Sequence, residues 1–197
     1  MKYASIAIAM LAGACAALAA EPLPMLSVIS VRPGDTLNLR EQPDARSRQL
    51  GFLAPTDGGI TIVGQAVQTL DWIQVQKGRA RGWANARFLA YGDAAEQRRL
   101  PVRLTCTGTE PFWSVEIGYG RADTNLDLGQ AKGRIALAAP ISASKHPNLW
   151  LHTALDRGDP SSLLIEAEAC SDGMSERRYA YSVAARLGDR LYSGCCR

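Results

Sequence analysis

The sequence has little of what catalysis and metal binding most often require. Only two of its 197 residues are histidines, His146 and His152. Two histidines with no cysteine at ligand spacing are a weak basis for a zinc site. A serine triad needs its base within hydrogen-bond reach of the nucleophile, and both histidines lie outside the motifs described below. We therefore expect no catalytic residues, no metal and no cofactor, in a protein that is not an enzyme.

The sequence also lacks a strong charge of one sign and, beyond its first twenty residues, any long apolar run. Twenty-two Lys and Arg against 19 Asp and Glu leave a formal charge of +3. The arginine pairs Arg98-Arg99 and Arg177-Arg178 are isolated, which is typical of solvated surface. We therefore expect no nucleic-acid partner. We also expect no transmembrane segment, because no later run approaches the length that crosses a bilayer.

The one apolar run, residues 6–20, is typical of a secretory signal. It follows Lys2 and ends in Ala17-Leu18-Ala19-Ala20, which has the small residues of a cleavage site. We interpret residues 1–20 as a signal peptide, and expect export to the periplasm or cell envelope. The alternative is a lipoprotein signal ending at Cys15, although Ala12 stands where such signals usually have leucine.

Cysteines are few, but their positions are informative. Beyond the signal, four remain, all in the C-terminal half: Cys106, Cys170, Cys195 and Cys196. An even number in an exported chain predicts disulfides. A bond between the neighbours Cys195 and Cys196 would close a strained ring. Neighbours on a strand point to opposite faces, so each should bond to a different partner. The residues alone leave two pairings open: Cys195 with Cys170 and Cys196 with Cys106, or Cys195 with Cys106 and Cys196 with Cys170.

Apolar and polar residues alternate with a period of two along much of the chain. Leu37 and Leu39, for example, alternate with Asn38 and Arg40, and the same pattern recurs at 72–76, 113–117 and 163–167. This period predicts strands, and no stretch of helix length shows a period of 3.6. The sequence therefore predicts an all-β fold.

The chain divides where the alternation stops. Residues 90–100 are rich in small and charged side chains, and we place a linker there. The predicted domains are residues 24–92 and 100–197, both of ordinary domain size. We expect them to fold separately with modest mutual contact.

The first domain resembles a bacterial SH3-like domain over about residues 26–91. The resemblance rests on spaced matches: Leu37, Leu39, Arg40, Pro43, Leu50-Gly51, 60–64, 72–75 and Gly82-Trp83. It implies a small barrel that binds peptidoglycan or an envelope protein. Aromatic faces offer such ligands a large contact area at low entropy cost. The candidate ligand residues are Arg40, Trp72, Trp83, Phe88 and Tyr91. The alternative for both tryptophans is a place in the core.

The second domain is similar to an exported bacterial family of uncharacterised function. Three motifs carry this resemblance: Gly108-Thr109-Glu110-Pro111-Phe112-Trp113, Cys170-Ser171-Asp172-Gly173-Met174-Ser175 and Gly194-Cys195-Cys196. It implies the disulfides Cys170–Cys195 and Cys106–Cys196. The candidate ligand residues are Glu110, Trp113, Asp172 and Ser175. In the alternative, structural interpretation, Phe112 and Trp113 fill one end of a barrel and Asp172-Gly173 makes a turn.

Together these features predict a small SH3-like barrel followed by a disulfide-bonded antiparallel β-barrel-like domain. The function that we expect is that of an exported, non-enzymatic cell-envelope protein. The alternative is a cell-wall hydrolase that the SH3-like domain directs to its substrate.

Overall fold

The computed structural model describes residues 24–64, 69–96, 99–126 and 131–197. Within these ranges the regular structure is β-strand, apart from one short 3-10 helix, η1 (Ala86–Phe88). The all-β prediction is therefore confirmed. The predicted signal peptide, and with it Cys15, lies outside the described residues. No helix in the described ranges is long and apolar enough to cross a membrane.

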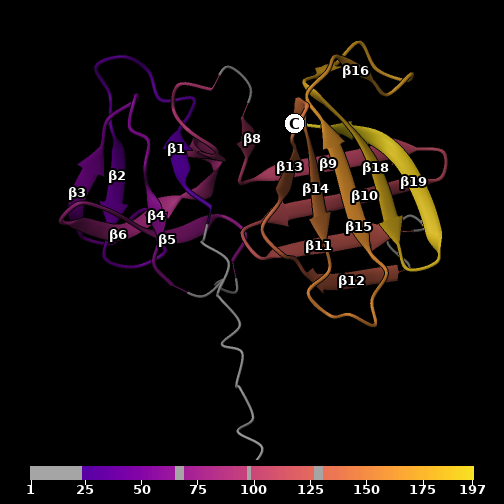
Figure 1. The fold of residues 1–197 in the computed structure, drawn as a ribbon, viewed down its shortest axis with the longest axis horizontal. Helices are drawn as coiled ribbons and strands as arrows, with labels where there is room; N and C mark the ends of the chain where they lie inside the picture. Colours follow the sequence, from indigo (N-terminus) through magenta and orange to yellow (C-terminus); the bar gives the residue numbers. More distant parts are fainter. Residues whose placement is uncertain (1–23, 65–68, 97–98, 127–130) are drawn as a thin grey trace, which may run out of the picture.

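A five-stranded antiparallel sheet forms much of the N-terminal half (Figure 1). In spatial order its strands are β3 (Gln49–Leu53), β2 (Leu37–Arg40), β6 (Ala80–Asn85), β5 (Trp72–Lys77) and β4 (Thr61–Ile62). Leu37 and Leu39 are buried, whereas Asn38 and Arg40 are half-buried on the opposite face. The alternation in the sequence thus separates a face on the core from a face toward solvent.

A nine-stranded antiparallel sheet forms the C-terminal half. Its spatial order is β12 (Ala131–Ala136), β11 (Arg121–Leu126), β10 (Phe112–Gly118), β9 (Leu104–Thr109), β19 (Arg190–Cys196), β18 (Tyr181–Leu187), β15 (Ser162–Glu166), β14 (His146–Thr153) and β13 (Ile141–Ala143). The sheet curls over on itself, so that β13, β14, β15 and β18 form one layer and β9 to β12 cross behind it (Figure 1). This curled half-barrel encloses alternate side chains of strands such as β9, β10, β15 and β18.

Both disulfides are anchored at the end of β19. Cys196 lies directly opposite Cys106 of β9 and is bonded to it on the inner face, where both are fully buried. Cys195 points to the outer face and is bonded to Cys170 of β16 (Cys170–Ser171). Strand β16 pairs with β17 (Arg178–Tyr179) in a small hairpin over the sheet. These are the two pairings that the family resemblance implied.

The two halves share buried apolar residues at their junction. A third sheet joins them, in the order β1 (Leu26–Val28), β7 (Leu89–Tyr91) and β8 (Leu100–Pro101). Strands β7 and β8 lie at the ends of the expected linker, and buried apolar side chains of both halves form one cluster. The segment looked like a linker because its polar middle, from Asp93 to Glu96, is a solvent-exposed turn.

Polar contacts reinforce this junction. The Arg99 guanidinium donates to Ser27 Oγ at 2.9 Å and to the Val28 carbonyl at 3.1 Å. The Tyr181 hydroxyl, from the C-terminal sheet, donates to the Arg99 carbonyl at 3.0 Å. Arg103 forms an ion pair with Asp71 of the N-terminal half at 3.2 Å. The apolar and polar contacts together join the two halves.

Candidate functional site

The outer face of the five-stranded sheet brings three of the predicted ligand residues together. Trp83 of β6 lies directly opposite Arg40 of β2 on one side and Gln74 of β5 on the other. Trp72 of β5 lies opposite Asn85 of β6. All five side chains are half-buried, so each keeps part of its surface in contact with solvent. We call Arg40, Trp72, Gln74, Trp83 and Asn85 the tryptophan face.

The burial pattern decides how the two tryptophans lie. Their strand neighbours Ile73, Val75 and Ala84 point inward and are at most 2% exposed. Trp72 and Trp83 therefore point outward, and neither belongs to the buried cluster. The same side of the sheet also carries Phe52, which we do not include in the tryptophan face. Phe52 lies opposite Asn38 and is 60% exposed. The half-exposed indoles are thus available to a ligand.

Arg40 has a structural contact as well as a place on this face. One guanidinium nitrogen donates to the Ser47 carbonyl at 2.9 Å and holds the loop that follows β2. The same loop is closed by the ion pair between Arg48 and Glu41 at 2.9 Å. This pair lowers the pKa of the Glu41 carboxyl, through the hydrogen bond from Arg48 and then its charge. Arg40 thus fixes one border of the tryptophan face.

The structure does not place Tyr91 on the tryptophan face. Its side chain is 5% exposed, and its ring packs edge-on against His152 of the C-terminal sheet at 6.2 Å between centroids. Burial raises the pKa of the Tyr91 hydroxyl. Phe88 is half-buried beneath the Arg87 guanidinium, 5.0 Å from the ring centroid. The sequence did not predict that Tyr91 packs against the C-terminal sheet. Alternation along a strand shows which of its faces is buried, but not which element covers that face.

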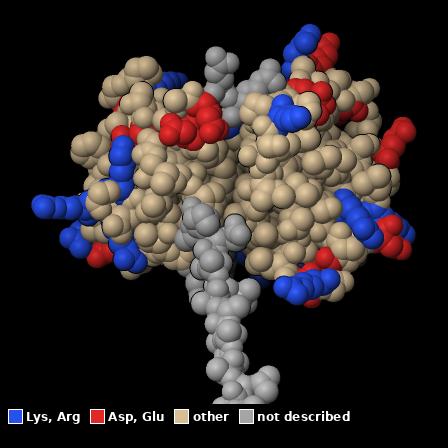
Figure 2. Space-filling view, in the orientation of Figure 1, with Lys and Arg blue, Asp and Glu red and all other residues tan. Residues whose placement is uncertain are grey.

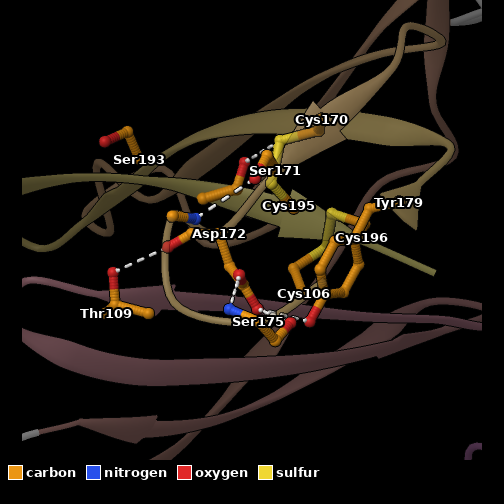
Figure 3. Close-up of a disulfide and its surroundings, with 12 residues drawn as sticks. Cys106, Thr109, Cys170, Ser171, Asp172, Ser175, Tyr179, Ser193, Cys195 and Cys196 are labelled. Carbon is orange, nitrogen blue, oxygen red and sulfur yellow. Dashed lines mark hydrogen bonds between the residues drawn. A yellow bond between two sulfur atoms is a disulfide. The ribbon is translucent and has the colours of Figure 1, made fainter. Parts of the chain in front are cut away.

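The three C-terminal motifs meet at one end of the nine-stranded sheet (Figure 3). A hollow of about 310 Å³ is lined by residues from all of them, including Glu110, Asp172 and Gly194. Thr109 donates to the backbone carbonyl of Asp172 at 3.4 Å, and the Cys170–Cys195 bond fixes the hairpin beside it. Segments more than 60 residues apart in the sequence are thereby brought together.

The Asp172 carboxylate is occupied by its own loop. It accepts hydrogen bonds from the backbone N–H groups of Ser175 at 2.8 Å and Met174 at 3.0 Å. The Ser175 hydroxyl at 2.8 Å and the Tyr179 hydroxyl at 3.1 Å also donate to it. These hydrogen bonds hold the pKa of the Asp172 carboxyl well below its usual range, and the bond from the Ser175 N–H has the largest effect. Asp172 and Ser175 thus make the turn that the structural interpretation expected.

The other motif residues divide between the interior and the surface. Trp113 is 4% exposed, packs against Tyr192 at 5.5 Å between ring centroids and donates from Nε1 to the Ser193 carbonyl. Phe112 is 47% exposed, so the expectation that it fills the barrel with Trp113 is wrong. Consecutive strand residues point to opposite faces, so only one of the two is able to point inward. Glu110 is exposed beside the hollow.

No metal centre is evident among the described residues. In those ranges no three His, Cys, Asp or Glu side chains are grouped so as to hold a metal ion. His152 is buried against the Ala138 carbonyl, with Nδ1 at 3.2 Å, while His146 is exposed on the same strand. The Ser175 hydroxyl contacts a carboxylate directly rather than an imidazole.

Comparison with known families bears on the N-terminal half. Residues 35–90 match the family model of the bacterial SH3 domain. The match covers β2 to η1 and nearly all of β7, and includes the whole tryptophan face. Bacterial SH3 domains bind cell-wall material. No curated protein and no solved structure matches the chain.

Proposed function

We propose that this is an exported, non-enzymatic protein of the cell envelope, and that the tryptophan face of its SH3 domain binds peptidoglycan. The observation that carries the proposal is the cross-strand row Arg40–Trp83–Gln74 with Trp72 beside it. Half-exposed indoles stack on sugar rings or peptide groups, and neighbouring amide and guanidinium groups supply hydrogen bonds. The two disulfides support export, since such bonds persist in oxidising compartments.

The charge distribution fits a ligand with carboxylate groups, such as the peptide stems of the wall. Lys and Arg side chains gather along the edge of the SH3 domain that is farthest from the C-terminal half (Figure 2). The β5–β6 hairpin contributes Arg79 and Arg81, both exposed, to the domain's basic side chains. Exposed charges of this kind raise the rate of association more than they raise affinity.

Co-sedimentation with purified peptidoglycan tests the proposal. We expect the wild-type protein to be retained, and Trp83→Ala to weaken binding roughly 5- to 150-fold, because a stacked aromatic contributes on the order of 1–3 kcal/mol. The matched control is Leu191→Ala, which shortens a side chain 76% exposed on the C-terminal sheet. Equal retention of wild type and Trp83→Ala would sink the proposal. Retention only in the presence of an envelope extract would instead indicate a protein partner.

The competing function is hydrolysis of the wall, with the SH3 domain as a targeting module. Glu110 is exposed and lines the hollow, and its carboxylate lies outside the Asp172 loop in sequence, so it is the residue to test. Zymography on cell-wall substrate decides between the two functions. Clearing that survives repurification and disappears in Glu110→Gln would replace the binding function with an enzymatic one.

A further inference from the structure

The outer face of strands β9 to β11 carries a row of short polar side chains. Thr107 lies directly opposite Ser114, and Ser114 directly opposite Asn125. On the same strands, inward-pointing neighbours such as Cys106, Val115 and Thr124 are buried. The row therefore faces solvent over a well-packed support, and such rigid elements position binding groups better than loops do.

Three hollows follow this row and join one another. The hollow at the Cys170–Cys195 bond shares Thr107 and Thr109 with a second, of about 340 Å³, that Phe112 lines. The second shares Ser114 and Asn125 with a third, of about 540 Å³, that reaches Arg134. Together they form a trough across β19, β9, β10, β11 and β12. We call it the polar trough, and at a strand spacing of about 4.8 Å it spans roughly 20 Å.

The acidic groups of the third hollow, Glu116 and Asp123, are compensated, whereas Glu110 and Asp172 line the first hollow. Glu116 forms an ion pair with Arg103 at 2.6 Å, and Asp123 forms ion pairs with Arg121 and, at 3.4 Å, with Arg134. Paired charges of this kind give little net attraction to a polyanion or a polycation. Glu110 and Asp172 lie at the first hollow and Lys132 at the third, whereas the middle hollow has only uncharged groups: hydroxyls, one amide and one exposed ring.

The remaining groups match those that recognise sugars. Asn125 is exposed, and its amide both donates and accepts hydrogen bonds, as sugar hydroxyls require. Phe112, which is 47% exposed and lines the middle hollow, offers an aromatic face to the apolar side of a sugar ring. The row Ile141–Leu151–Leu164–Ala184 on the other layer is apolar throughout, and charged side chains lie around the rim rather than the middle of the face turned to the viewer (Figure 2).

We infer that the polar trough is a second ligand site, and that it binds an uncharged glycan chain. The choice of a glycan among polar polymers rests on the proposed wall-binding function. The glycan crosses five strands of the sheet and stacks one of its sugar rings on Phe112. Thr107, Ser114 and Asn125 form hydrogen bonds with its hydroxyl groups. The protein then holds wall material at two places, through its SH3 domain and through its C-terminal sheet. Two linked sites raise the overall affinity above that of either alone.

Isothermal titration with a β-1,4-linked N-acetylglucosamine tetramer tests the trough directly, on the purified protein with both disulfides formed. We expect the wild type to bind the tetramer, and Phe112→Ala and Asn125→Leu each to weaken binding at least about tenfold. Both changes are at exposed positions, and thermal unfolding checks that each variant remains folded. The matched control is Thr153→Val, at an exposed threonine on the other layer of the same sheet. It should bind as the wild type does.

The outcomes separate this inference from the function proposed for the SH3 domain. Tetramer binding that Trp83→Ala abolishes while the trough variants leave it unchanged would place the sugar on the SH3 domain and overturn the inference. No binding of the tetramer at millimolar concentration would overturn it too, as would binding of an extended peptide in its place. Tetramer binding by a protein that peptidoglycan does not retain would overturn only the proposed function.

Discussion

Two glycines determine how Trp113 crosses the end of the C-terminal sheet. A Cβ at Gly108 would lie 2.0 Å from Trp113 Nε1, and a Cβ at Gly194 would lie 2.2 Å from the Thr107 carbonyl oxygen. Real side chains do not approach so closely, so the indole or a strand would have to move. The glycines of the first and third motifs are therefore explained by packing, and they let Trp113 donate to Ser193.

His152 is the residue whose environment has the clearest consequence for stability. Its side chain is 2% exposed, between the two halves of the molecule. Burial lowers its pKa from 6.5 to about 4, against a smaller opposite effect of the hydrogen bond with the Ala138 carbonyl. In the unfolded chain His152 takes up a proton as the pH falls through 6.5, whereas in the folded protein it stays neutral until the pH approaches 4. The stability that neutral, buried His152 contributes is therefore fully present above pH 6.5 and is lost as the pH falls toward 4.

We predict that lowering the pH from about 7.5 to about 5 removes about 2 kcal/mol of unfolding free energy through His152 alone. His152→Gln should lose correspondingly less over this range, because glutamine does not titrate. Urea unfolding of both proteins at the two pH values measures the difference. His146→Gln is the matched control, at an exposed histidine on the same strand. Equal pH dependence of His152→Gln and wild type would show that His152 is protonated in the folded state or is not buried.

At the scale of elements, the end of β19 organises the C-terminal half. The strand places one cysteine on each face of the sheet, and the two bonds span 90 and 25 residues of sequence. The longer bond joins β9 to β19 within the core, whereas the shorter one holds the β16–β17 hairpin on the outside. The hairpin lines part of the polar trough, so the second bond matters for the trough as well as for stability.

Removal of each disulfide should therefore have a different effect. In the chain-entropy relation, loss of the 90-residue closure costs roughly 4.5 kcal/mol and loss of the 25-residue closure roughly 3.5 kcal/mol. We predict that Cys106→Ala/Cys196→Ala destabilises the protein more than Cys170→Ala/Cys195→Ala in denaturant unfolding. Only the second pair should also weaken tetramer binding with the fold retained. The reverse order of stabilities would mean that strain or residual unfolded structure outweighs loop closure.

At the scale of the whole molecule, the shared core makes the two halves one structural unit. Leu70 of the SH3 half lies against Gly118 of the sheet, where an added Cβ would be 2.9 Å from it. Strand β1 pairs with β7, and β7 with β8, so that the chain passes from one half to the other within a sheet. Continuous packing of this kind couples the unfolding of both halves.

We predict a single unfolding transition in calorimetry of the intact, oxidised protein. A chain that ends at Asp93 lacks β8 and uncovers Tyr91, so it should be several kcal/mol less stable than the SH3 half within the whole protein. Circular dichroism during thermal unfolding compares the two. Two separate transitions in the intact protein, one of them matching the shorter chain, would restore the picture of independent domains.

The sequence by itself determined the local structure. The period of two at Leu37–Arg40 depends only on near neighbours along the chain, and it predicts both the strand and its buried face. The same reasoning established that Cys195 and Cys196 point to opposite sides. The spaced matches over residues 26–91 identified the SH3 domain, and with it Arg40, Trp72 and Trp83 as candidate ligand residues.

Only the tertiary structure decided which residues meet. Alternation does not say that Cys106 lies opposite Cys196, 90 residues away, or that His152 covers Tyr91. It also did not find the row Thr107–Ser114–Asn125, because these residues are ordinary polar positions until the register of three strands aligns them. Strand register and curling of the sheet depend on contacts between distant segments. A pattern along a single strand does not contain those contacts.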